Sequence, residues 1–287
     1  MGREAVMVRS DPRYSQMGQP KLVHHPGLSN EDYHHLKAVS PSQIKELKRS
    51  PLHYFDRFLA EDRVKKPPTD AMLKGTALHT AILEPQLWDA TIAVPPHSFD
   101  RRTKAGKEMA AEFERESIGK IVLSPEDADE VRRMADAVRQ HPAARFLLDL
   151  PGRREASYTW TDEATGLECK TRPDWHSDDR RIVVDVKTAQ DACREAFAKS
   201  ISNLDYHVQA AWNLDAQGAQ MFLSLVVENT RPYAVAVYPA SEALIEAGRR
   251  RISVAMERLA ECWRTNTWPG YGDQIQESID LPAWNRD

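Results

Sequence analysis

The sequence is poor in cysteine, has no long apolar run and carries no excess of positive charge. Its three cysteines, Cys169, Cys193 and Cys262, form no Cys-x-x-Cys pair, which argues against zinc fingers and cysteine-bound clusters and is typical of a reducing cytosol. No apolar stretch approaches the ~18 residues of a membrane span, and the N-terminus lacks the apolar core of a signal peptide. We therefore expect a soluble, cytoplasmic protein without a membrane partner.

The balance of charge limits how the protein can contact nucleic acid. Asp and Glu total 43 residues against 39 Lys and Arg, which gives a net charge of −4. A surface that is basic all over is therefore excluded. Any binding of nucleic acid would depend on a local cluster of positive charge or on a metal ion.

The pattern of apolar residues divides the chain into a helical first half and a strand-rich second half. Residues 1–27 show no periodicity, so we expect a flexible leader. Residues 28–151 indicate helices, several of which start at Ser-Pro pairs. Residues 152–264 follow the order β-β-β-α-β-β-α, which predicts an α/β (α+β) fold with a mixed central β-sheet flanked by helices. Residues 265–287 form a tail, and the whole is expected to be one integrated domain.

A charged pair lies inside the most apolar of the predicted strands, "RIVVDVK". Asp185 and Lys187 are two residues apart, so their side chains emerge on the same face of the strand. Placing these charges beside a core costs several kcal/mol unless each has a partner. A bound metal ion and a phosphate group would supply such partners, whereas a solvated ion pair at the strand end would have no chemical role.

A second carboxylate, that of Asp174, follows the preceding strand in "RPDW". Neighbouring strands of a meander run antiparallel, which separates Asp174 from Asp185 unless the strands cross or splay around residues 176–179. If they converge, two carboxylates would bind a hard divalent cation, and Lys187 would hold or polarise a water molecule beside it. This arrangement suits hydrolysis of a phosphodiester.

These motifs resemble those of a known superfamily. "RPDW…IVVDVKTA" resembles the signature of the PD-(D/E)XK nucleases, and "LKGTALHTAILEP" is similar to the histidine-bearing helix of the RecB-like and RecE-like members. The similarity extends from about residue 28 to residue 264 and is greatest for the RecE-type exonucleases, the exonuclease VIII family. The resemblance implies a restriction-endonuclease-like core, here residues 152–264, with an N-terminal helical segment that carries His79.

The resemblance also implies roles for individual residues. The metal ligands would be His79, Asp174, Asp185 and the backbone carbonyl of Val186, with Mg²⁺ as the ion and Mn²⁺ as a substitute. Lys187 would be the catalytic lysine and Glu155 the acidic residue of the first core strand. "DYHVQ" would line the DNA-facing side with Tyr206 and Gln209, although Asn213 stands where many RecB-like nucleases have a tyrosine. From spacing alone, His79 and Tyr206 are more typical of packed core residues.

Two further segments are rich in positive charge. The basic turn "RRTKAGKE" is the best candidate for gripping DNA phosphates, and the predicted DNA-binding residues are Arg101, Arg102, Lys104 and Arg172. "GRRRIS", at 248–253, lies in the final helix. We interpret it as solvent-facing and leave a phosphate or subunit contact open.

By resemblance, the expected function is that of a Mg²⁺-dependent exodeoxyribonuclease. It would degrade one strand of linear duplex DNA from 5′ to 3′ and leave 3′ tails for recombination. A phage or prophage origin, a ring-shaped homo-oligomer such as a tetramer and a RecT-type annealing partner are implied in the same way. A RecB-like single-strand nuclease or endonuclease would share all these site residues, and a non-catalytic DNA-binding module on the same fold is the third alternative.

Overall fold

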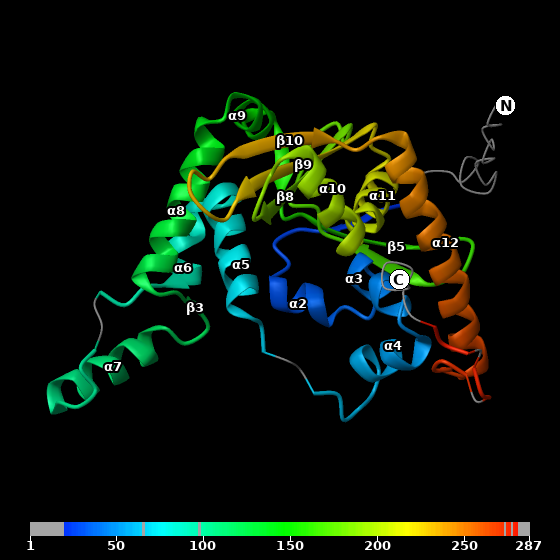
Figure 1. Cartoon of the computed structure of the whole chain (residues 1–287), viewed down its shortest axis with the longest axis horizontal. Coiled ribbons are helices and arrows are strands. Elements are labelled where there is room, and N and C mark those ends of the chain that lie inside the picture. The colour runs from blue at the N-terminus through cyan, green and yellow to red at the C-terminus, as the bar shows by residue number, and fades with distance from the viewer. Residues whose placement is uncertain (1–19, 65–66, 97–98, 273, 277, 281–287) are drawn as a thin grey trace.

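A five-stranded mixed sheet forms the centre of the molecule, with helices on both faces (Figure 1). The computed structural model describes residues 20–64, 67–96, 99–272, 274–276 and 278–280. The strands of this sheet lie in the order β10-β9-β8-β7-β4, and only β8 and β9 are parallel. Their bounds are β4 Gly152–Arg154, β7 Trp175–Ser177, β8 Ile182–Ala189, β9 Met221–Glu228 and β10 Val235–Pro239. The predicted fold class is confirmed.

Two smaller sheets accompany the central one. The first has the order β1-β5-β6 and consists of β1 Val23–His25, β5 Ser157–Thr161 and β6 Glu168–Thr171. The second pairs β2 Ile92–Ala93 with β3 Ile121–Val122. Because β1 pairs with β5, the folded chain begins before residue 28. The rest of the predicted leader, residues 1–19, lies outside the described residues.

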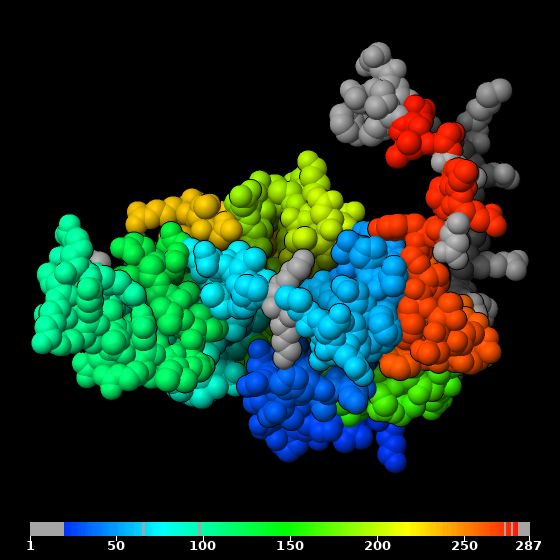
Figure 2. All heavy atoms as spheres, turned by 90° about the horizontal axis from the view of Figure 1, so that it is seen from below, coloured from blue at the N-terminus to red at the C-terminus, as the bar shows by residue number. Residues whose placement is uncertain are grey.

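The helices form two groups on opposite sides of the sheet. One group comprises α5 Asp70–Leu83, α6 Trp88–Thr91, α7 Lys104–Glu116, α8 Pro125–Gln140 and α9 Pro142–Asp149, with the short 3-10 turn η1 Pro85–Leu87. The other comprises α2 Asn30–His35, α3 Pro41–Leu47, α4 Pro51–Phe58, α10 Arg194–Asn203, α11 Tyr206–Gln217 and α12 Glu242–Thr265. Seen from below (Figure 2), the blue residues of α2–α4 and the cyan and green residues of α5–α9 lie on different sides of the molecule.

Alternation along β8 divides the core between these two groups. Val184 and Val186 pack in the core that α5, α8 and α9 share with the sheet. Val183 packs in the other core, against α3, α4, α11 and α12. Since side chains alternate along a strand, Asp185 and Lys187 face the same side as Val183. None of the described helices is long and apolar enough to cross a membrane.

The first two predicted strands do not belong to one flat meander. Each of them is divided between two sheets. The first predicted strand consists of β4 and β5, and the second consists of β6 and β7. β4 pairs with β7 in the central sheet, whereas β5 pairs with β6 in the smaller one. The long hairpin therefore bends at Glu155–Ala156 on one arm and at Arg172–Asp174 on the other. The expected separation of the two aspartates is wrong, because residues 175–177 form strand β7 and continue the pairing. Trp175 lies opposite Val184 in the antiparallel β7–β8 pair, so the next position places Asp174 opposite Asp185.

Candidate metal and catalytic site

Three side chains from separate elements meet at the bend of the hairpin. His79 comes from α5, Glu155 directly follows β4 and Asp174 directly precedes β7. The Nδ1 atom of His79 lies 3.7 Å from Oε1 of Glu155 and 3.5 Å from Oδ1 of Asp174. One ligand atom from each of the three residues lies within 4.8 Å of the others. This separation allows one small cation to contact all three.

The backbone of Glu155 is strained at this point. Its φ angle is +48°, in the left-handed region that costs a residue with a Cβ atom about 1–2 kcal/mol. The backbone N–H of Glu155 donates to the carbonyl of Asp174 over 3.0 Å, which ties the two arms of the bend together. Strain held by surrounding structure is characteristic of functional positions. Here it accompanies a carboxylate that faces His79.

Asp174 and His79 are each held by the backbone of β8. The backbone N–H of Val186 donates to Oδ2 of Asp174 over 2.6 Å, which leaves Oδ1 toward His79. The Nε2 atom of His79 lies 3.2 Å from the carbonyl oxygen of Val186 and donates to it. The predicted carbonyl of Val186 is therefore within reach of the cluster, on the same side as the imidazole.

Asp185 is held differently from Asp174. Its Oδ2 forms an ion pair with the ammonium of Lys187, and its Oδ1 accepts a hydrogen bond of 2.7 Å from Nε2 of Gln209 on α11. The side chain of Asp185 is only 2% exposed and that of Lys187 14%. Both Asp185 oxygens are thus engaged outside the cluster of His79, Glu155 and Asp174. The predicted role of Asp185 as a direct metal ligand stays a prediction.

Buried charges at the site shift one another's pKa values. Burial lowers the pKa of His79, but the carboxylates of Asp174 and Glu155 outweigh it and raise the pKa to about 9. Burial raises the pKa of Asp174 and of Asp185, against the opposing effect of Lys187. Lys187 itself has a raised pKa, because Asp185 and Asp174 overcome the effect of its burial. The site therefore concentrates negative charge in a place where a cation would be stabilised.

The donor set suits a hard divalent cation. It contains the carboxylates of Glu155 and Asp174, the carbonyl of Val186 and one imidazole, and no thiol. Oxygen donors favour Mg²⁺ and Mn²⁺, and an imidazole is compatible with Mn²⁺ as well. Since the buried carboxylate of Asp174 and the half-buried one of Glu155 lie close together, a bound cation would also relieve their mutual repulsion.

The predicted Tyr206 lies beside Lys187 rather than in the cluster of His79, Glu155 and Asp174. The Nζ atom of Lys187 is 4.9 Å from the centre of the Tyr206 ring, and Nζ of Lys45, from α3, is 5.3 Å from the same ring. Burial, together with the nearby positive charge of Lys187, lowers the pKa of Lys45 to about 8. The sequence contains no motif that singles out Lys45, so its place next to the site was not predicted.

The structure does not bring the basic turn next to the site. Figure 1 shows α7, which follows this turn, projecting away from the central sheet. Each predicted cation of the turn also has a local acidic partner: Arg101 pairs with Glu114, Arg102 with Asp100 and Lys104 with Glu108. Their role in binding DNA stays a prediction.

Arg172 and Lys170 anchor the N-terminal segment. The guanidinium of Arg172 donates to the hydroxyl of Ser157 and to the carbonyls of Leu28 and Ser29, and it lies over the ring of Tyr33. The ammonium of Lys170 donates to three carbonyls at the end of α2, those of Tyr33, His34 and Leu36. These contacts of Arg172 hold the N-terminal segment, and its role in binding DNA stays a prediction; Lys170 was not predicted at all.

Comparison with known proteins gives the family and the fold of the chain. A family model described as "PDDEXK-like domain of unknown function (DUF3799)" matches residues 40–280. The crystal structure of a "Putative exonuclease" from Eubacterium rectale has a TM-score of 0.57 and 11% sequence identity, and the match covers 90% of this chain and 98% of that one. At this identity the likeness concerns the fold alone.

Two other comparisons add no argument. The structure of SSO0001 is 11% identical over 66% of this chain and 88% of that one, with a TM-score of 0.29, which is too low to support an inference. No curated protein matches the sequence.

Proposed function

Because this chain belongs to the family of PDDEXK-like domains (DUF3799) within the PD-(D/E)XK nuclease superfamily, we propose that it is a metal-dependent nuclease that hydrolyses phosphodiester bonds in DNA. The observation that supports this most strongly is the convergence of His79, Glu155 and Asp174 beside the buried Asp185–Lys187 pair. A structural ion pair would not require three further ionisable side chains at the same bend.

In the proposed mechanism, His79, Glu155, Asp174 and the Val186 carbonyl would hold the cation. A bound Mg²⁺ or Mn²⁺ would lower the pKa of a water molecule and neutralise charge on the phosphate. Lys187 keeps a positive charge beside the site, where it orients the attacking water and stabilises the negative charge that develops on the phosphate.

The remaining residues position Lys187. Asp185 holds its ammonium through the ion pair, and Gln209 fixes the other oxygen of Asp185 from α11. A catalytic side chain gains from such support because small displacements from the reactive geometry are costly.

The finer proposal is a Mg²⁺-dependent exonuclease that degrades one strand of linear duplex DNA from 5′ to 3′. The 3′ tails would then serve recombination inside the cell. A ring-shaped homo-oligomer such as a tetramer, a RecT-type annealing partner and a phage or prophage origin belong to the same proposal. The support for these features is the resemblance of "RPDW…IVVDVKTA" and "LKGTALHTAILEP" to the motifs of RecE-type exonucleases.

The proposal can be tested with linear duplex DNA labelled at one 5′ end and closed circular duplex DNA. Each substrate is incubated with purified protein in Mg²⁺, in Mn²⁺ and in chelator. We expect early release of labelled mononucleotide from the linear DNA only, and only with a divalent cation. Lys187→Met and Asp174→Asn should abolish this release.

Other outcomes distinguish the alternatives. Cutting of the circular DNA would identify an endonuclease, and cleavage restricted to single strands would identify a RecB-like single-strand nuclease. Binding of DNA without cleavage under any of these conditions would refute the nuclease proposal in favour of a DNA-binding module.

A further inference from the structure

A groove with a volume of about 410 Å³ lies between α3, the start of α11 and α12. Five positively charged side chains line it, together with one carboxylate: Lys45, Lys48, Arg250, Arg251, Arg258 and Asp205. The rest of the described lining is aliphatic, with no aromatic side chain. On a protein of net charge −4, this is a strong local excess of positive charge.

The periodicity of α12 produces this excess. Arg251 directly follows Arg250, and Arg258 comes seven residues, or about two turns, after Arg251. With a helical period of 3.6, this spacing places all three on one exposed face of the helix. Ile252 and Leu259 are buried on the opposite face. The spacing of the arginines thus leaves an exposed basic stripe along the helix.

Arg249 belongs to a different face of the same helix. Its guanidinium lies 2.6 Å from Asp215 and 2.5 Å from Glu246. Two carboxylates therefore neutralise it, and it does not line the groove. Only part of the "GRRRIS" segment contributes to the basic stripe.

The groove cations are mostly without acidic partners. Among the residues that the structure describes, no carboxylate lies within ion-pair distance of Lys45, Arg250 or Arg258. Asp205 is shared, at 3.1 Å from Lys48 and 3.6 Å from Arg251. The uncompensated charge favours a polyanionic ligand, because like charges in a concave surface raise the local potential.

Lys45 connects the groove to the catalytic site. Its ammonium and that of Lys187 both contact the ring of Tyr206, at 5.3 and 4.9 Å from the ring centre. From there the stripe from Arg250 to Arg258 extends over about 12 Å of helix axis, at about 1.5 Å per residue. That length is sufficient for more than one phosphate of a nucleic-acid strand, whose phosphates follow one another at about 3.4 Å along a duplex axis.

We propose that this groove binds successive backbone phosphates of the DNA strand that is cut at the neighbouring site. The inference rests on the proposed nuclease function and adds the path of the strand. Arginine and lysine contacts to phosphate fix the position of DNA without reading its bases. Since the groove has no aromatic platform for stacking, the proposed contact is independent of sequence.

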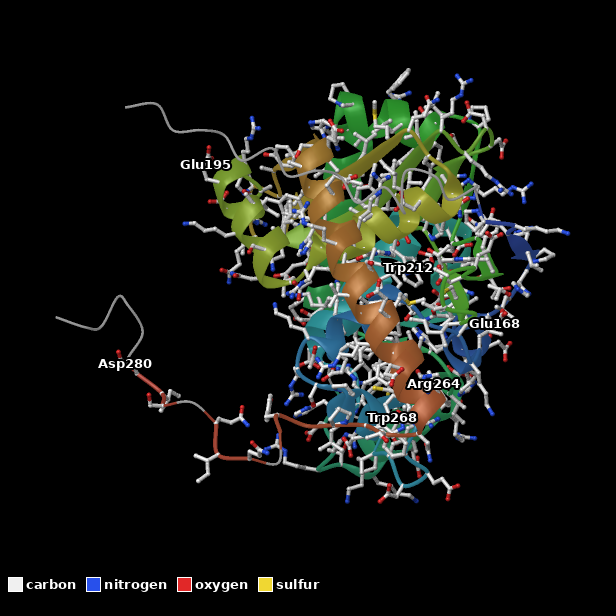
Figure 3. All side chains as sticks on the ribbon, turned by 90° about the vertical axis from the view of Figure 1, so that its right-hand side faces the viewer. Glu168, Glu195, Trp212, Arg264, Trp268 and Asp280 are labelled. Carbon is white, nitrogen blue, oxygen red and sulfur yellow. The ribbon has the colours of Figure 1, made fainter. Side chains whose placement is uncertain are left out.

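The test compares two charge-matched triple variants with the wild type. Arg250→Gln/Arg251→Gln/Arg258→Gln removes three groove cations. Arg133→Gln/Arg145→Gln/Arg264→Gln removes three exposed arginines that pair with local carboxylates elsewhere. Figure 3 shows one of the control positions, Arg264, near the far end of α12.

Binding of a labelled duplex oligonucleotide is measured by fluorescence anisotropy in chelator, over a range of salt concentrations. We expect the groove variant to bind at least about tenfold more weakly at moderate salt. Its plot of log affinity against log salt should be shallower by about 0.9 for each phosphate that the protein no longer neutralises. The control variant should match the wild type in both readouts, and thermal unfolding should show that all three proteins are folded.

The outcomes separate this inference from the nuclease proposal. Equal affinity and salt slope in the groove variant and the wild type would overturn the groove assignment, even if the wild type cleaves DNA. Weak binding by the groove variant, together with no cleavage by the wild type in Mg²⁺ or Mn²⁺, would support the groove and overturn the nuclease.

Discussion

Two substitutions of Glu155 should distinguish the effect of its backbone on the stability of the protein from the effect of its carboxylate on DNA cleavage. Its carboxylate faces His79, and its backbone has a φ of +48°. Glycine adopts this conformation without the penalty that a Cβ atom brings, whereas alanine keeps the penalty. Glu155→Gly and Glu155→Ala both remove the carboxylate, so the difference between their stabilities isolates the backbone strain.

The expected magnitude follows from two opposing effects. Relief of left-handed strain stabilises the glycine variant by about 1–2 kcal/mol. The greater freedom of glycine in the unfolded chain offsets about 0.5–1 kcal/mol of this gain. Glu155→Gly should therefore be more stable than Glu155→Ala by about 1 kcal/mol, which corresponds to roughly 2–3 °C in melting temperature for a chain of this size.

Activity should respond equally in the two variants. Removal of a metal ligand takes away several kcal/mol of transition-state stabilisation, and each 1.4 kcal/mol or so is a factor of ten in rate. We expect DNA cleavage to fall at least about 100-fold in both. Urea unfolding in chelator measures the stabilities, and release of label from linear duplex DNA in Mg²⁺ measures the rates.

Arg180 provides a matched control. It also has a positive φ, +59°, but lies in the turn between β7 and β8. Arg180→Gly should exceed Arg180→Ala in stability by a similar amount, with cleavage unchanged. Equal stability of the two Glu155 variants would refute the argument from strain, and full activity in either would remove this carboxylate from the site.

Three other substitutions test the charges around the site. Lys187→Met should leave Asp185 buried without its cation and lower the metal-free free energy of unfolding by about 3 kcal/mol, measured by urea titration; an unchanged value would contradict the buried ion pair. Lys45, with a pKa of about 8, loses its charge between about pH 7 and pH 9, so DNA affinity in chelator should fall over this range. Lys45→Arg, which stays charged, should abolish this fall, and its persistence would refute the assignment to Lys45. Lys170→Met should destabilise the fold by about 3 kcal/mol because three carbonyls at the end of α2 lose a charged donor; chemical denaturation would disprove this by showing no loss.

The local features of the fold follow directly from sequence patterns. Ser124 accepts a hydrogen bond from the backbone N–H of Asp127, as expected at the start of a helix, although Ser40 makes no such bond. The apolar run of β8 predicted a buried strand, and the spacing of Asp185 and Lys187 placed both on one face. The pattern is informative here because the period of a strand decides which residues share a face.

The bend of the hairpin could not be predicted in this way. Periodicity indicated one strand across "LECKTRPDW", since it does not register where a strand changes its partner. The positive φ of Glu155 occurs at a residue type with no preference for it, so propensity carries no signal there. Likewise, no sequence pattern indicated that the guanidinium of Arg172 lies against the carbonyls of Leu28 and Ser29; its role in binding DNA stays a prediction.

The bend also explains why the ionisable side chains gather at this place. In a continuous ladder, neighbouring strands would use the backbone groups on both arms, and their side chains would alternate between the two faces. Where the ladder is interrupted, Asp174 takes over both connections: its carbonyl accepts the N–H of Glu155, and its carboxylate accepts the N–H of Val186. The interruption thus leaves no buried donor unsatisfied at these two positions, and it directs the carboxylates of Asp174 and Glu155 toward His79 on α5. The backbone defect and the candidate metal site are therefore one feature, since the hydrogen bonds that close the bend also hold the proposed ligands in place.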